Sequence, residues 1–163
     1  MIRKIEIDRF SLTSSKPFDE VVAGVNAAIG HPNMTEFARS THEARSFPEL
    51  KNAVEKGLST AGLMLFMQLD QGAVLRKEMG RDVPKIVRLL IGNPLIMKEM
   101  AKHVPDAGSY APVTVLVDER ADGVHLSYDR MASFLAPYEN RDALEVARDL
   151  DSKVEDLLRR AAA

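Results

Sequence analysis

Apolar positions along the chain repeat in two patterns, one typical of strands and one typical of helices. Nearly alternating apolar residues predict a first strand over residues 2–12. Short apolar runs predict strands at 63–67, 86–91 and 113–117, and the Asp122-Gly123 hairpin signal predicts a partner strand at 124–128. Apolar residues at helical spacing predict the helices, at 17–29, 34–37, 47–58, 71–79, 94–104 and 141–163.

The run from 86 to 91 is the most apolar strand, and Arg88 alone interrupts it, which is typical of a strand covered on both faces. Gly92 follows, and it permits backbone angles or a close approach that a side chain would block. Asn93 and Pro94 are typical of a helix cap and a first helical residue. A helix N-terminus here would also attract an anion, but the single glycine lacks a phosphate-cradling pattern, which favours a plain turn.

The order of these elements predicts the fold class. Strands and helices mix without strict alternation, and the last hairpin must be antiparallel. We therefore expect a single α+β domain over residues 1–163, with a mostly antiparallel sheet and helices packed on it. Residues 31–58 have the pattern of a helical insertion. Residues 141–163 form a long amphipathic helix whose apolar stripe we interpret as core rather than as an interaction surface.

Composition excludes several classes of function. The chain has 163 residues, no cysteine and a formal charge of -2. Disulfides, thiol catalysis and cysteine metal sites are excluded, and we expect neither nucleic acid nor an anionic membrane as a partner. The N-terminal residues lack the apolar segment of a signal peptide, and no apolar run is long enough to span a bilayer. We therefore expect a cytoplasmic protein.

Motifs for known chemistry are incomplete. His42-Glu43 begins like a zinc-binding helix, but the position four residues after His42 is Ser46 instead of a second histidine. Phosphate-binding and dinucleotide-binding glycine patterns do not occur. The sequence therefore predicts no metal site and no cofactor. The histidines lie in four separate segments, at His31, His42, His103 and His125.

Several blocks of the chain are similar to one known family. The segments 89–94 (LLIGNP), 111–117 and 122–128 resemble the bacterial and archaeal family called domain of unknown function 302, and the segments 17–22 and 66–70 occur in the matching order. The resemblance implies a compact α+β fold like one repeat of the TATA-box-binding protein, usually a homodimer, and no established activity. The family commonly has a histidine after the aspartate that ends the second strand, whereas this chain has Gln71. The helical residues 31–58 are a second departure.

Three functions stay open. The first is a homodimeric small-ligand-binding domain with no established catalytic activity, whose ligand lies near the strand ends. The second is an enzyme that uses acid–base groups in a cleft. The third is a protein–protein interaction module. The expected ligand-binding residues are Asp70, Gln71, Gly92, Asn93 and Tyr128, and the candidate acid–base groups are Asp70, Glu43, His42 and His125.

Overall fold

Residues 2–163, which the computed structural model describes, contain one five-stranded sheet in the order β1-β5-β4-β3-β2. Every neighbouring pair of strands is antiparallel. The strands are β1 (Arg9–Ser14), β2 (Met64–Asp70), β3 (Ile86–Gly92), β4 (Val113–Arg120) and β5 (Gly123–Asp129). The helices are α1 (Phe18–Ala28), α2 (Met34–Glu43), α3 (Phe47–Glu55), α4 (Gly72–Met79), α5 (Pro94–Ala101), α6 (Met131–Leu135) and α7 (Arg141–Ala162), with 3₁₀ turns at Pro105–Ser109 and Ala136–Tyr138.

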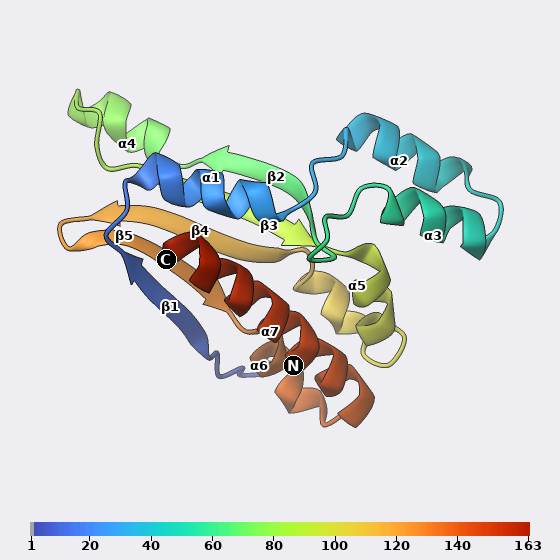
Figure 1. Cartoon of the computed structure of the whole chain (residues 1–163). Helices are drawn as coiled ribbons and strands as arrows, with labels where there is room; N and C mark the ends of the chain where they lie inside the picture. Colours follow the sequence, from blue (N-terminus) through green and yellow to red (C-terminus); the bar gives the residue numbers. More distant parts are fainter. Residues whose placement is uncertain (1) are drawn as a thin grey trace.

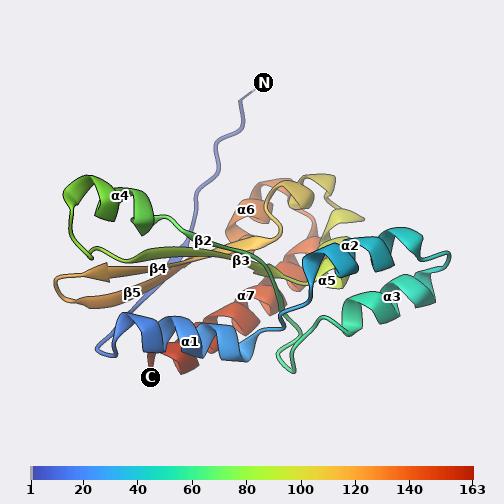
Figure 2. The ribbon, with the colours of Figure 1, turned by 90° about the horizontal axis from the view of Figure 1, so that it is seen from above.

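Helices α1 and α7 cover one face of the sheet (Figures 1 and 2). We call the opposite side the open face. In β3 the residues Val87, Leu89 and Ile91 point to the covered face and are buried, while Arg88 and Leu90 between them are only half-buried. The prediction that this strand is covered on both faces is therefore wrong. Its composition resembles a doubly covered strand because the open-face positions are also mostly apolar.

Helix α7 completes the core. It crosses the covered face of the sheet beside α1 (Figure 1) and buries seven apolar side chains, together with two acidic ones. The buried apolar residues are Ala143, Ala147, Leu150, Val154, Leu157, Leu158 and Ala161. This burial confirms the interpretation of the apolar stripe as core.

The first strand begins later than its alternating pattern predicts. Strand β1 starts at Arg9, and the residues before it are outside the sheet: Ile2 is 93% exposed and Ile7 is 47% exposed. The reason is the register, because Arg9 pairs with Asp129, the last residue of β5. Residues 2–8 extend beyond the end of β5, so no strand within residues 2–163 lies beside them with which their alternating residues could pair.

Local interactions form two helix caps and one tight turn. The Asn33 side chain accepts hydrogen bonds from the first turn of α2, and the Ser46 hydroxyl accepts one from α3. Strands β4 and β5 form the expected hairpin, although the two residues between the paired Arg120 and Gly123 are Ala121 and Asp122. These caps and this turn can be predicted from the sequence, because each depends on neighbouring residues only.

Helices α2 and α3 form a hairpin that projects beside the sheet (Figure 2). Helix α2 has no buried residue, and α3 is anchored by Val54, which is 1% exposed.

The predicted fold class, a single α+β domain with an antiparallel sheet and a long C-terminal helix, is confirmed. No helix within residues 2–163 has the length and apolar character needed to cross a membrane.

Candidate functional site

A small apolar cavity lies where β3 turns into α5. Its volume is about 120 Å³. The Gly92-Asn93-Pro94 turn and the start of β4 both line it. The apolar lining residues come from β2, α5, β4 with the segment before it, and α7, namely Phe66, Met97, Met100, Ala111, Pro112, Val113 and Leu150.

Asn93 holds the turn that lines this cavity. Its Oδ1 accepts a hydrogen bond from the Leu95 backbone N–H at 2.8 Å, and its Nδ2 donates to the Gly62 carbonyl at 3.0 Å. Pro94 has no N–H, and the Met97 N–H bonds to the Asn93 carbonyl. The backbone N–H groups at the start of α5 therefore largely have acceptors within the protein. No charged residue within residues 2–163 lines the cavity.

Gly92 leaves space in the cavity. Its backbone does not have a positive φ, and an added Cβ would lie 3.5 Å from Pro112 Cβ and 3.7 Å from Phe66 Cε2, which are ordinary contacts. The turn itself therefore uses neither the special backbone angles nor the close approach that a glycine would permit. The absence of a side chain instead keeps this part of the cavity empty. At Gly30, in contrast, an added Cβ would lie 2.0 Å from the Gly57 carbonyl oxygen.

Asp70 and Gln71 lie at the other end of the sheet from this cavity. Because β2 and β3 are antiparallel, Met64 pairs with Gly92, whereas Asp70 pairs with Val87. Asp70 forms an ion pair with Arg76, with Oδ2 2.6 Å from Nη2, and this hydrogen bond lowers the pKa of the Asp70 carboxyl. Gln71 precedes α4 and lines a different cavity, on the open face. The expected ligand-binding residues are therefore divided between two ends of the molecule.

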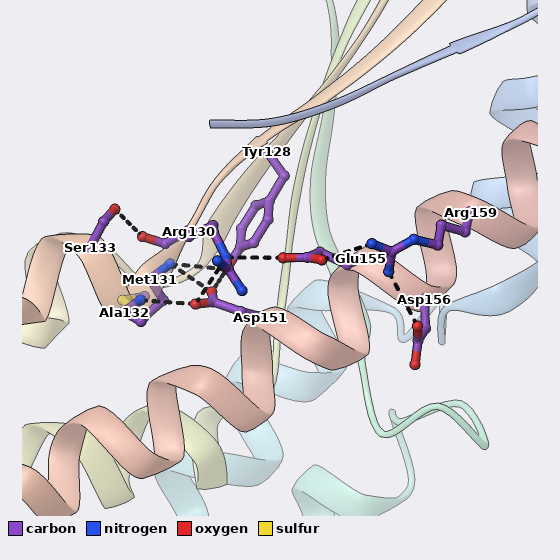
Figure 3. A network of polar contacts seen from close by, with 9 residues as sticks. All are labelled: Tyr128, Arg130, Met131, Ala132, Ser133, Asp151, Glu155, Asp156 and Arg159. Atoms are coloured by element: carbon purple, nitrogen blue, oxygen red, sulfur yellow. Dashed lines mark hydrogen bonds and ion pairs between the residues drawn. The ribbon is translucent and has the colours of Figure 1, made fainter. Parts of the chain in front are cut away.

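Tyr128 lies in a buried polar network (Figure 3). Its hydroxyl is 2.6 Å from Asp151 Oδ1, and its side chain is on the covered face of β5. The Asp151 carboxylate also accepts hydrogen bonds from the backbone N–H groups of Met131 and Ala132, at 2.7 and 3.1 Å. Asp151 thus caps the N-terminus of α6 from a distant helix.

Burial governs the ionisation of this network. Burial raises the pKa of the Asp151 carboxyl, against the opposing effect of its hydrogen-bond donors. The pKa of Tyr128 is raised for the same reason, strengthened by the adjacent carboxylate. Tyr128 therefore stays protonated and remains a donor to Asp151 at neutral pH. Arg130 and Arg159 extend the network toward solvent through Glu155.

The candidate acid–base groups have separate partners. Asp70 pairs with Arg76, and His125 Nε2 is 2.8 Å from Asp122 Oδ1 on the β4–β5 hairpin. His42 and Glu43 end α2, which projects at the other side of the molecule from that hairpin (Figure 1). Within residues 2–163, no group of three or more His, Asp or Glu side chains is arranged to hold a metal ion.

Comparison with protein families identifies the chain. The family model described as "Domain of unknown function DUF302" matches residues 40–161. The chain belongs to the DUF302 family. The match includes β2 to β5 and α7, so it covers the cavity and the Tyr128–Asp151 network.

A solved structure supports the fold of this DUF302 protein. The crystal structure of an uncharacterized conserved DUF302 protein from Bacillus stearothermophilus is similar with a TM-score of 0.66 and 14% sequence identity. The alignment covers 94% of this chain and 97% of that one. At this identity the likeness concerns the fold alone. No curated protein matches the sequence.

Some residues that line cavities in this DUF302 protein were not among the residues expected from the sequence. Met97 and Met100 have the pattern of core residues, and an apolar cavity lining has that same pattern. Arg88 stands out only as the charged residue in an apolar strand. Its alternation with Val87 and Leu89 is the signal that would have placed it on a second, uncovered face.

Proposed function

We propose that this DUF302 protein is a cytoplasmic small-ligand-binding protein whose apolar ligand occupies the cavity beside the Gly92-Asn93-Pro94 turn. The supporting observation is the combination of an apolar lining and a missing side chain at Gly92. The cavity is partly open to solvent, and its size and apolar lining suit a small apolar group, whose burial there removes apolar surface from water.

Gly92→Ala tests the ligand site because it adds one methyl group to the cavity wall without a steric clash. The probe is benzene, detected by the methyl signals of a protein with ¹³C-methyl-labelled methionine, in which Met97 and Met100 line the cavity. We expect benzene to shift these two signals in the parent and to bind at least about threefold more weakly to Gly92→Ala, because the added methyl removes part of the cavity.

Gly108→Ala is the matched control. Gly108 is exposed in a 3₁₀ turn, has no positive φ and has no atom within 4 Å of an added Cβ, so this variant makes the same chemical change away from the cavity. Benzene binding should be equal in Gly108→Ala and the parent. Equal binding in Gly92→Ala as well would remove this cavity as the ligand site.

We also propose that the protein forms a homodimer. Exposed apolar side chains gather on β2, on α4 and in the segment after α4, which we call the β2–α4 surface. Strand β2 is an edge of the sheet. Its first residues pair with Gly30, because the Leu65 N–H donates to the Gly30 carbonyl, and the outer side of the rest of β2 has no partner strand within residues 2–163 and can take a second copy. The exposed residues of this surface are Met67, Leu69, Val74, Leu75, Met79 and Val83.

A further inference from the structure

The open face of the sheet contains a second cavity, of about 240 Å³, with Arg88 in its lining. It lies over the middle strands, because Arg88 pairs with Leu116 of β4 and with Leu69 of β2. Most of its lining residues have polar side chains, in contrast to the cavity beside Gly92, and they include Thr114 and Ser127 from the neighbouring strands.

Arg88 carries a charge that no neighbouring carboxylate neutralises. Among residues 2–163, no Asp or Glu forms an ion pair with Arg88. Its Nη2 donates to Thr114 Oγ1 at 3.1 Å, while its Nε is buried and has no hydrogen-bond partner in the protein. A guanidinium group carries its N–H donors in a planar fork, so Arg88 keeps further Nη donors beyond the one that Thr114 accepts.

The acidic residue that lines this cavity, Asp129, already has a basic partner. Asp129 binds Arg9 through two hydrogen bonds, of 2.6 and 2.9 Å, so these two charges cancel. The cavity therefore keeps one net positive charge, that of Arg88. The Ser127 hydroxyl and the Gln71 side-chain amide also line the cavity, and neither forms a hydrogen bond within the part of the chain that the structure describes.

We propose that the Arg88 cavity binds a small molecule through a single carboxylate group. The planar guanidinium matches a carboxylate through two parallel hydrogen bonds, and one unpaired cation balances one carboxylate. Ser127 and Gln71 supply neutral hydrogen bonds to the rest of the molecule. This site is separate from the apolar cavity at the opposite end of β3.

A titration followed by amide NMR signals tests the proposal. The probe is benzoate, and the neutral comparison is benzamide, which has nearly the same shape without the charge. We expect benzoate to shift the backbone amide signals of Arg88, Thr114 and Ser127 in a saturable manner. Benzamide should bind at least about tenfold more weakly, because it cannot form the charge-assisted pair.

Variants separate the role of Arg88 from a general charge effect. Arg88→Gln should weaken benzoate binding at least about tenfold, and Arg88→Lys, which keeps the charge but loses the fork, should give an intermediate affinity. The matched control is Arg148→Gln, which makes the same charge change on an exposed position of α7 and should bind benzoate like the parent. The amide spectrum of each variant also reports whether it is folded.

Three outcomes would overturn the carboxylate site. Equal shifts with benzoate and benzamide would show that charge is not recognised. Benzoate shifts that persist in folded Arg88→Gln or Arg88→Lys with unchanged affinity would exclude the guanidinium as the binding group. Tighter binding of inorganic phosphate than of benzoate would assign the cavity to a different anion.

Discussion

At the scale of single residues, Asp151 places a carboxylate inside the core. It is fully buried, and its two oxygens accept from Tyr128, Met131 and Ala132. These donors come from the end of β5 and the start of α6, while Asp151 itself belongs to α7. One side chain thus joins three elements through hydrogen bonds that are shielded from water.

Replacing Asp151 by asparagine should lower the free energy of unfolding by about 2–4 kcal/mol. The amide has one accepting oxygen, and its NH₂ group would face other donors. The measurement is urea unfolding at pH 7. A loss below roughly 0.5 kcal/mol, the range of ordinary surface changes, would contradict the importance of this carboxylate.

Tyr128→Phe is a milder change in the same network. It removes one donor, while the two backbone N–H groups continue to bind Asp151. We expect a loss of about 1 kcal/mol in the free energy of unfolding, measured in the same urea series. A loss as large as that of Asp151→Asn would mean that the hydroxyl, and not the helix cap, dominates the network.

At the scale of elements, helices with the same kind of cap differ in how they join the core. Asn33 caps α2 and Asn140 caps α7, each through side-chain Oδ1. Helix α2 buries no residue, whereas α7 buries nine. The same chemical loss should therefore produce a local effect in one helix and a global effect in the other.

Asn140→Ala should lower the global free energy of unfolding by about 1 kcal/mol, while Asn33→Ala should leave it nearly unchanged. Asn33→Ala should instead speed amide hydrogen exchange within α2. Urea unfolding and hydrogen exchange read by mass spectrometry measure the two effects. A global loss in Asn33→Ala equal to that in Asn140→Ala would show that α2 unfolds together with the core.

The elements also show which parts of the structure are readable from sequence. Caps such as Asn93 and Ser46 were predictable, because their partners lie within three residues. The strand expected from residue 2 was not, because a ladder needs a partner strand and β5 ends opposite Arg9. Gly92 and Gln71 were grouped as one site, but the antiparallel pairing of β2 and β3 separates them. In both cases the pairing of residues between strands decides the outcome, and the local sequence pattern does not contain that information.

At the scale of the whole molecule, the two faces of the sheet have different surroundings. The face under α1 and α7 is a closed core, while the other face has the Arg88 cavity and borders α4 (Figure 2). The β2–α4 surface adds exposed apolar side chains beside a free sheet edge. Clustered exposed apolar residues of this kind are typical of interaction sites.

Val74→Asp tests the proposed dimer. Val74 is 73% exposed, so the change should leave the fold intact while placing a charge in the dimer interface. Light scattering after size-exclusion chromatography should give a dimer for the parent and a monomer for Val74→Asp. The control is Ile2→Asp, at a 93% exposed apolar residue outside this surface, which should remain a dimer.

Two outcomes would contradict the proposed dimer or its interface. A monomeric parent protein would contradict the homodimer. A dimeric Val74→Asp would contradict the β2–α4 surface as its interface, even if the parent is a dimer. Circular dichroism of the variants confirms that a change in mass reflects association and not unfolding.

The strand order has a consequence for the synthesis of the protein. Strand β1 is made first, but its partner is β5, and the paired residues Arg9 and Asp129 lie 120 positions apart. The start of α6 also lacks its capping carboxylate until α7 has been made. A growing chain on the ribosome therefore cannot close its sheet or cover its core early, and we expect it to reach the native state only after most of its residues have left the ribosome.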